Sequence, residues 1–184
     1  MDKILIVKIG GNLINNSQIL NRFLKSFAKI ETKKILIHGG GNQVTKMCKK
    51  LNLDIKIRNG RRITSIQDLE VAAMIYAGSL NKTLVTKLQS FNCNSIGLSG
   101  ADANLIESVK RPVKEIDYGL VGDIKKINSV FLKKLIDQNL TPVICSITHD
   151  KNGQLLNTNA DTISSEIAIS LSKYYIVDLI YCHE

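Results

Sequence analysis

Strand-length runs of apolar residues alternate along the chain with segments whose apolar residues recur every three or four positions. The first pattern is typical of buried strands and the second of amphipathic helices. We predict strands over 3–9, 34–37, 95–98, 141–146 and 174–181, and shorter strands over 105–109 and 119–124. We predict helices over 17–30, 43–51, 64–89, 129–138 and 159–172. Strands that alternate with helices indicate an α/β fold with a mainly parallel sheet.

Local signals refine three of these elements. The dipeptide Asn59-Gly60 lies between residues 54–57 and 61–63, and Asn-Gly is a strong signal for a β-hairpin, here over 54–63. Ser17 is placed to cap the first helix. The string Thr64-Ser65-Ile66-Gln67 resembles a capping box, and it opens a long helix whose only weak point is Gly78.

The composition is that of a globular domain. The chain has 184 residues, of which 44% are hydrophobic and 22% are charged. No apolar run approaches the ~20 residues that a membrane helix needs. The first apolar run is too short for a signal peptide and follows Asp2. We therefore expect one domain in the cytoplasm, without a membrane partner.

The net charge of +9 comes mostly from Lys residues that are spread along the chain. Aromatic residues make up 5% and Trp is absent, whereas a nucleic-acid surface needs clustered basic residues with aromatic platforms. We expect no nucleic-acid partner, and small anionic ligands suit the charge equally well. The four Cys are scattered and form no Cys-x-x-Cys pair, so we expect reduced thiols and no metal site.

Two glycine-rich strings each follow a predicted strand. The first is Lys8-Ile9-Gly10-Gly11 and the second is His38-Gly39-Gly40-Gly41. Glycines at the end of a strand let backbone N–H groups approach an anion, and a following helix adds positive potential. Lys8 alternates with Ile4 and Ile6, which places its ammonium at the carboxyl end of the sheet, where open α/β sheets bind ligands. Glycines that merely form tight turns remain an alternative, although two such loops favour an anion site.

A third cluster, Asn157-Thr158-Asn159-Ala160-Asp161, lies at a loop-to-helix junction. One interpretation is a helix cap with a polar first turn. In the other, Asn157 binds a ligand and the Asp161 carboxylate orients Lys8. The pattern itself leaves both open.

Several known motifs are absent from the sequence. There is no G-x-x-x-x-G-K-[ST] string and no G-x-G-x-x-G after a strand, which disfavours P-loop and Rossmann nucleotide sites. The His-Gly-Gly-Gly string could form the oxyanion loop of an α/β-hydrolase, but the required G-x-S-x-G string is missing. A hydrolase is therefore a minor alternative.

The set of motifs resembles the N-terminal portion of the N-acetylglutamate kinases in the amino acid kinase family. The resemblance rests on strings that occur in the family's order and spacing over essentially the whole chain. They are the two glycine loops, Asn59-Gly60-Arg61-Arg62-Ile63-Thr64, Asn81-Lys82, Gly119-Leu120-Val121-Gly122-Asp123-Ile124 and Asn157-Thr158-Asn159-Ala160-Asp161. The resemblance implies a three-layer αβα sandwich with a mainly parallel open sheet and a β-hairpin lid.

The resemblance also implies an activity, which is phosphoryl transfer from ATP to the side-chain carboxylate of N-acetyl-L-glutamate in arginine biosynthesis. Mg²⁺ would arrive with the nucleotide rather than on protein ligands. Lys8 would stabilise charge on the transferring phosphoryl group, to which Gly10 and Gly11 would supply backbone N–H groups. Asp161 would organise the catalytic Lys residues. Since the substrate carboxylate attacks, catalysis would consist mostly of positioning and charge neutralisation.

The remaining implied roles concern the acceptor. Gly40 and Gly41 would contact the acyl-amino acid, and Arg62 would pair with its α-carboxylate, for which a planar guanidinium is suited. Asn157 would help to hold the substrate, and the 54–63 hairpin would cover the acyl group. N-succinylglutamate is an alternative acceptor, because the hairpin is rich in basic residues.

The resemblance covers only part of the family's length. Residues 1–184 would form the acyl-amino-acid-binding portion of an amino acid kinase domain, whereas the portion that carries most of the nucleotide site and a second catalytic Lys would be absent. We expect a homodimer, and a separate C-terminal half is a further candidate partner. A truncated remnant that binds acyl-glutamate without catalysis is the alternative function.

Overall fold

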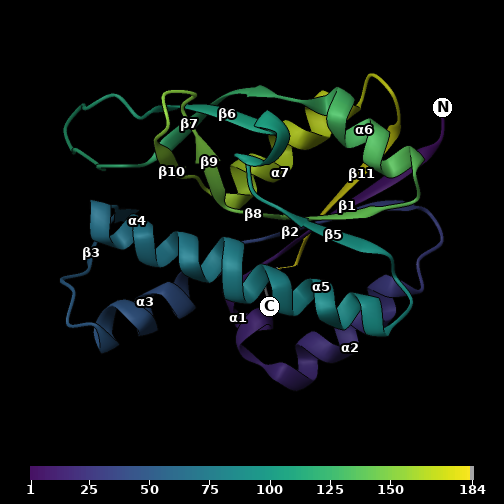
Figure 1. The fold of residues 1–184 in the computed structure, drawn as a ribbon, viewed down its shortest axis with the longest axis horizontal. Coiled ribbons are helices and arrows are strands. Elements are labelled where there is room, and N and C mark those ends of the chain that lie inside the picture. The colour runs from purple at the N-terminus through teal and green to yellow at the C-terminus, as the bar shows by residue number, and fades with distance from the viewer. Residues whose placement is uncertain (183–184) are drawn as a thin grey trace.

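The computed structural model describes residues 1–182, and its centre is a five-stranded sheet in which all neighbouring strands pair in parallel (Figure 1). In spatial order the strands are β11 (Ile176–Cys182), β1 (Lys3–Ile9), β2 (Lys33–His38), β8 (Thr141–Cys145) and β5 (Ser95–Leu98). All five strands were predicted from apolar runs, with ends that differ by two residues at most. The predicted mainly parallel sheet is confirmed.

Helices cover both faces of this sheet, so the predicted three-layer αβα arrangement is confirmed (Figure 1). One face carries α1 (Gly11–Asn15), α2 (Ser17–Ala28), α3 (Gly41–Lys50), α4 (Ile66–Ala73), η1 (Met74–Leu80) and α5 (Asn81–Ser90). The other face carries α6 (Ser129–Asp137) and α7 (Ala160–Leu171). Alternate residues of β1 divide between the two cores: Val7 and Ile9 pack on the first side, and Ile4 and Ile6 on the second. None of the helices in the described range has the length and hydropathy to cross a bilayer.

A second sheet of four strands lies at one end of the molecule, beside α7 (Figure 1). Its spatial order is β10 (Leu155–Asn157), β9 (Ile147–His149), β6 (Ile106–Lys110) and β7 (Gly122–Ile127), and the short η2 (Asp102–Asn104) precedes β6. We predicted β6 and β7 approximately but not β9 or β10. These two strands have three residues each, too few for an alternating pattern to be recognised.

The predicted hairpin is present as β3 (Lys56–Arg58) and β4 (Arg61–Ile63), which pair antiparallel. Asn59 has φ 49° and Gly60 has φ 72°. A turn with positive φ at both central residues matches the twist of a two-residue hairpin, which is why Asn-Gly is favoured there.

Two predicted helix caps are shifted by one residue. Asn16, not Ser17, caps α2, because its side chain accepts hydrogen bonds from the backbone N–H groups of Gln18 and Ile19. The capping box of α4 pairs Ser65 with Asp68, rather than Thr64 with Gln67. In both cases the residue with extended backbone immediately before the first helical turn is the cap.

The long helix predicted over 64–89 is continuous, but its middle is not α-helical. Residues Met74–Leu80 form the π-helical segment η1, which contains Gly78. The predicted weak point therefore lies inside the segment in which the helical pitch changes. π-helical turns inside α-helices are rare and occur frequently at functional sites.

Candidate functional site

Many polar groups gather where β1, β2 and β8 end. Because the strands are parallel, their carboxyl ends meet at one edge of the sheet, and a cavity of about 360 Å³ opens there. All the residues that we predicted for the site line this one cavity. They are Lys8, Gly10, Gly11, Gly40, Gly41, Arg62, Asn157 and Asp161. They come from four segments that are far apart in the sequence, so the fold brings them together.

Lys8 and Asp161 form an ion pair with Nζ and Oδ1 2.8 Å apart. The alternation of β1 turns Lys8 toward α7, as its shared face with Ile4 and Ile6 predicted. Asp161 lies in the first turn of α7, which Asn159 caps by accepting a hydrogen bond from the N–H of Thr162. The Lys8 side chain is 10% exposed and that of Asp161 is 45% exposed. The predicted contact is present, with the carboxylate at the open side of the cavity.

Tyr181 of β11 holds the first turns of α7 in place by hydrogen bonds. Its hydroxyl lies 2.7 Å from Ser165 Oγ and donates to the backbone O of Asp161 at 3.3 Å. Tyr181 is the β11 residue in register with Lys8 on β1. The partner of Lys8 is therefore positioned by a neighbouring strand, which sequence inspection did not identify.

The two glycine loops begin helices at the cavity. Gly10 precedes α1 and Gly40 precedes α3, and neither N-terminus has a side-chain cap within the described residues. Gly40 has φ 145°, and a Cβ there would lie 2.7 Å from Leu80 Cδ2 and 3.2 Å from Tyr76 Cε1. Position 40 therefore requires glycine for its backbone conformation and for the close approach of η1. The loop brings backbone groups to the cavity wall, as we predicted from the glycines.

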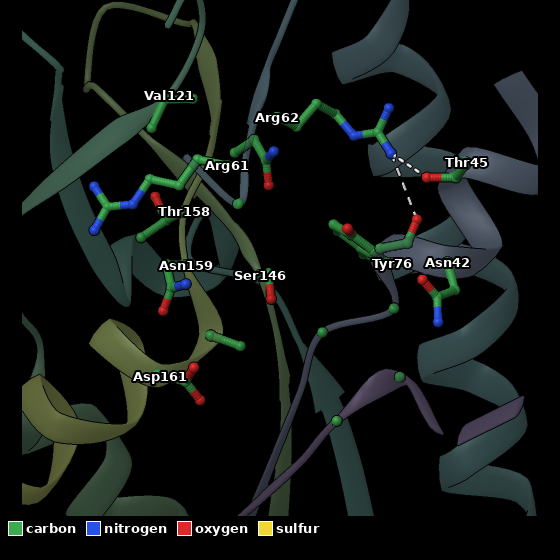
Figure 2. Close-up of a pocket in the computed structure, with 18 of the residues that line it drawn as sticks. Asn42, Thr45, Arg61, Arg62, Tyr76, Val121, Ser146, Thr158, Asn159 and Asp161 are labelled. Atoms are coloured by element: carbon green, nitrogen blue, oxygen red, sulfur yellow. Dashed lines mark hydrogen bonds between the residues drawn. The ribbon is translucent and has the colours of Figure 1, made fainter. Parts of the chain in front are cut away.

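Arg62 lies on β4 and extends toward α3, across the cavity from Asp161 (Figure 2). Its Nη2 donates to Thr45 Oγ1 at 2.6 Å and to Gly41 O at 3.5 Å. Its Nη1 lies 3.6 Å from Asp68 Oδ1, the carboxylate of the capping box. The side chain is only 9% exposed, so the guanidinium is held on three sides, whereas Arg61 points the other way.

Asn157 joins the second sheet to the hairpin. Its Nδ2 donates to Thr64 Oγ1 at 3.1 Å, and its backbone N–H donates to Leu120 O at 2.9 Å. Thr64 follows β4 directly and is fully buried. The residue that we expected to hold a ligand thus also connects the walls of the cavity.

The cavity is electropositive. Lys8, Arg61, Arg62 and Arg111 line it, and Asp161 is its only acidic lining residue in the part of the chain that the structure describes. Arg111 is partly neutralised, because its guanidinium binds Asp123 Oδ1 at 2.6 and 3.0 Å. The excess of cations suits a ligand that carries more than one negative charge.

His38 supports the second glycine loop and stays neutral. Its Nδ1 donates to Gly39 O at 2.9 Å, while its Nε2 accepts from Asn81 Nδ2 at 3.1 Å. Complete burial lowers the pKa of His38 to about 4. Its geometry is that of a buried structural support for the loop.

Several lining residues were not among the predicted ones, and they differ in how they could have been found. Ser146 directly follows β8, so the rule that ligands bind at carboxyl ends of parallel strands points to it. Asn42 and Thr45 follow a glycine loop that was already singled out. Tyr76 carries no such signal, because it lies inside an apolar helical stretch.

The hydrolase alternative finds no support in the geometry. Ser99, which follows β5, donates its hydroxyl to Asp102 Oδ2 at 2.8 Å and does not line the cavity. Among residues 1–182 no group of three or more His, Cys, Asp or Glu side chains could hold a metal ion. The four Cys are all free thiols.

Comparison with known proteins agrees with the geometry. The sequence is 50% identical over its whole length to the acetylglutamate kinase of Cytophaga hutchinsonii, of which it covers 70%. It is 47% identical over its whole length to the acetylglutamate kinase of Parabacteroides distasonis, of which it covers 72%.

Solved structures show the same fold. The N-acetylglutamate synthase from Neisseria gonorrhoeae, complexed with coenzyme A and N-acetyl-glutamate, superposes with a TM-score of 0.81 at 19% identity. The superposition covers 97% of this chain and 41% of the synthase. The amino acid kinase family model matches residues 3–179. The resemblance inferred from the motifs is thereby confirmed, and the chain belongs to the amino acid kinase family.

Proposed function

We propose that this protein is an acetylglutamate kinase, which transfers the γ-phosphoryl group of ATP to the side-chain carboxylate of N-acetyl-L-glutamate. The observation that carries the proposal is an electropositive cavity lined both by Lys8, which is paired with Asp161, and by Arg62, which lies across the cavity from Asp161. The names of the relatives, which are 47–50% identical over the whole chain, support it. The reaction belongs to amino-acid biosynthesis, in which we assign it to the arginine route in the cytoplasm.

In this reaction a carboxylate oxygen of the substrate forms a bond to the γ-phosphorus while the bond from that phosphorus to the β,γ-bridging oxygen breaks. ADP leaves with the bond electrons, and the product is an acyl phosphate. Lys8 would neutralise charge on the equatorial oxygens of the transferring group, and Asp161 would keep the Lys8 ammonium in place at 2.8 Å. Backbone N–H groups of Gly10 and Gly11 would donate to the same oxygens.

The acceptor would lie against the opposite wall. Arg62, held by Thr45 and Gly41, would grip the α-carboxylate, and Gly40 and Gly41 would let the ligand approach the backbone closely. Asn157 would hold the acyl-amino acid from the second sheet. The β3–β4 hairpin, which supplies Ile57, Gly60 and Arg61 to the cavity wall, would cover it.

The number of carboxylates that line the cavity indicates how Mg²⁺ would be bound. Asp161 is the only acidic lining residue among those described and is already paired with Lys8. The residues therefore fit Mg²⁺ that is carried by the nucleotide phosphates rather than by a protein cage. We propose that residues 1–184 form the acyl-amino-acid-binding portion of the kinase domain and act as a homodimer. A separate polypeptide that supplies further nucleotide contacts is the other candidate partner.

A coupled ADP-release assay with N-acetyl-L-glutamate tests the activity, alone and with a C-terminal portion supplied in trans. We expect Lys8→Ala to lower the rate about 100-fold or more while the acceptor affinity changes little, since Lys8 acts on the transition state. Lys25→Ala, on the outer helix α2, is the matched control. Calorimetry that shows acyl-glutamate binding without turnover in either format would indicate a non-catalytic remnant and contradict the proposal.

A further inference from the structure

The π-helical segment η1 places an aromatic side chain directly on the second glycine loop. Tyr76 and Leu80 are both buried, and both face Gly40. A Cβ at position 40 would lie 3.2 Å from Tyr76 Cε1, so ring and loop are in van der Waals contact. The altered pitch of η1 and the missing side chain of Gly40 therefore act together to bring the ring to the cavity wall.

The hydroxyl of Tyr76 ends in the cavity without a hydrogen-bond partner among the described residues. The side chain is 6% exposed, and the residue lines the cavity. The hydroxyl is not among the buried polar atoms without a partner, so it is reached from the cavity and is open to a ligand there. Burial raises the pKa of Tyr76 to about 12, and the positive charge of Arg62 opposes part of that rise. The hydroxyl therefore remains a hydrogen-bond donor at every physiological pH.

Tyr76 and Arg62 converge on the same backbone position. A Cβ at position 41 would lie 3.9 Å from Tyr76 Oη, and Arg62 Nη2 donates to the carbonyl of Gly41 at 3.5 Å. In Figure 2 Tyr76 lies on the same side of the cavity as Arg62 and Thr45, across from Asp161. A ligand group that reaches Arg62 would therefore also come within reach of the phenol hydroxyl.

We propose that Tyr76 is a further substrate-binding residue, whose hydroxyl donates a hydrogen bond to an oxygen of the carboxylate that Arg62 binds. A carboxylate has two oxygens with several acceptor sites, so it satisfies the guanidinium and the phenol together. The inference rests on the proposed function for the identity of the ligand. It adds that one wall of the cavity recognises the acceptor through the positive charge of Arg62 and through the neutral hydroxyl of Tyr76. The π-helical pitch of η1 sets the position of that hydroxyl.

The test is calorimetric titration of N-acetyl-L-glutamate into the wild-type protein, Tyr76→Phe and Tyr174→Phe, with a thermal melt of each without ligand. Tyr76→Phe keeps the ring that packs on Gly40 and removes only the hydroxyl. Tyr174→Phe removes the same atom beyond the far end of α7 and is the matched control. We expect Tyr76→Phe to raise the Kd about tenfold, with an unchanged or raised Tm, and the control to leave the Kd unchanged.

The outcomes separate the two proposals. Wild-type binding with an equal Kd for Tyr76→Phe overturns the role of Tyr76 and leaves the proposed function intact. A Tm of Tyr76→Phe that falls well below that of the control means that the hydroxyl has a structural partner, which also overturns it. A wild-type protein that binds no N-acetyl-L-glutamate overturns the proposed function and the role of Tyr76 with it.

Discussion

His38 shows how far the site depends on a side chain that does not contact the ligand in the proposed reaction. The imidazole is fully buried and bonded on one side to Gly39 O and on the other to Asn81. The backbone O of His38 accepts a hydrogen bond from Ser146 Oγ at 2.9 Å. One residue thus links two of the segments that line the cavity, and protonation of its ring would break the bond to Asn81.

This burial predicts acid sensitivity. The pKa of His38 is lowered to about 4 in the folded protein, whereas it lies near 6.5 when the residue is exposed, as in the unfolded chain. The unfolded state therefore binds the extra proton as the pH falls from about 6.5 toward 4. We expect His38 to lower the free energy of unfolding by about 3 kcal/mol over that interval, and to contribute no pH dependence above it.

Urea unfolding between pH 4 and pH 7.5 measures the effect in the wild-type protein and in His38→Gln, which does not titrate. Because carboxylates titrate equally in both proteins, the difference between the two curves isolates the histidine. A difference in the free energy of unfolding that stays constant across the range would contradict the prediction.

Single positions differ in how much of their role the sequence could predict. The alternation along β1 and the cap before α7 were enough to bring Lys8 and Asp161 together. Arg62 was singled out by its motif, but its contacts with Thr45 and Asp68 depend on the packing of three separate elements. Tyr76 could not be predicted, because an apolar helical stretch gives no sign of which ring reaches a cavity.

The N-terminus of α4 connects helix capping to the cavity through Arg62. Ser65 Oγ accepts from the Asp68 N–H at 3.1 Å and donates to Asp68 Oδ2 at 2.7 Å. The other oxygen of the same carboxylate faces Arg62. The cap that starts the helix therefore also orients the acid beside the guanidinium.

We expect Ser65→Ala to lower the free energy of unfolding by about 1 kcal/mol, the usual cost of a lost N-cap. Chemical denaturation measures the change. Ser90→Ala at the C-terminal end of α5 is the control. That serine caps no helix N-terminus, so its loss should have little effect on the free energy of unfolding. Equal destabilisation by the two substitutions would contradict the role given to the cap.

Pitch within an element is harder to predict than its extent. Apolar spacing gave the full length of the helix from α4 to α5, and Gly78 correctly marked a weak point. Over seven residues, the spacing of apolar side chains does not distinguish the 3.6-residue turn of an α-helix from the wider turn of a π-helix. The segment η1 could therefore not be predicted. The strands β9 and β10 were missed for the same reason, because each has only three residues.

The two sheets meet at Gly100, where the molecule has no room for a side chain. The Gly100 N–H donates to Ile147 O at 2.6 Å, and its carbonyl accepts from the Ile106 N–H at 2.9 Å. A Cβ there would lie 2.8 Å from Thr148 Cα and 2.9 Å from Ile147 O, both backbone atoms. The loop that follows β5 of the first sheet is therefore held against β9 and β6 of the second sheet, which supplies Asn157, through a glycine contact.

We expect Gly100→Ala to lower the free energy of unfolding by about 3 kcal/mol, because backbone must move to admit the methyl group. In the matched control Gly78→Ala the Cβ meets nothing within 4 Å, so stability should be unchanged or raised by up to about 1 kcal/mol. Thermal and chemical unfolding measure both. A Gly100→Ala protein as stable as the control would show that the backbone around position 100 admits a methyl group without cost, which contradicts the prediction.

At the level of the whole fold, the parallel sheet and its two helical layers were predictable because long apolar runs alternate with helical periods. The division into two sheets was not, since it depends on short strands and on the close approach at Gly100. The cavity followed from topology once the sheet was known to be parallel.

The ion pair between Lys8 and Asp161 also has a consequence for biosynthesis, since its partners are roughly 150 residues apart. At the usual rate of 5–20 residues per second, a ribosome needs about 8–30 s to reach Asp161 after making Lys8. Until then β1 lacks α7 on one face and β11 along one edge. The nascent chain must carry an incompletely covered apolar strand throughout that interval, so the end of the cavity that holds Lys8 and Asp161 forms last.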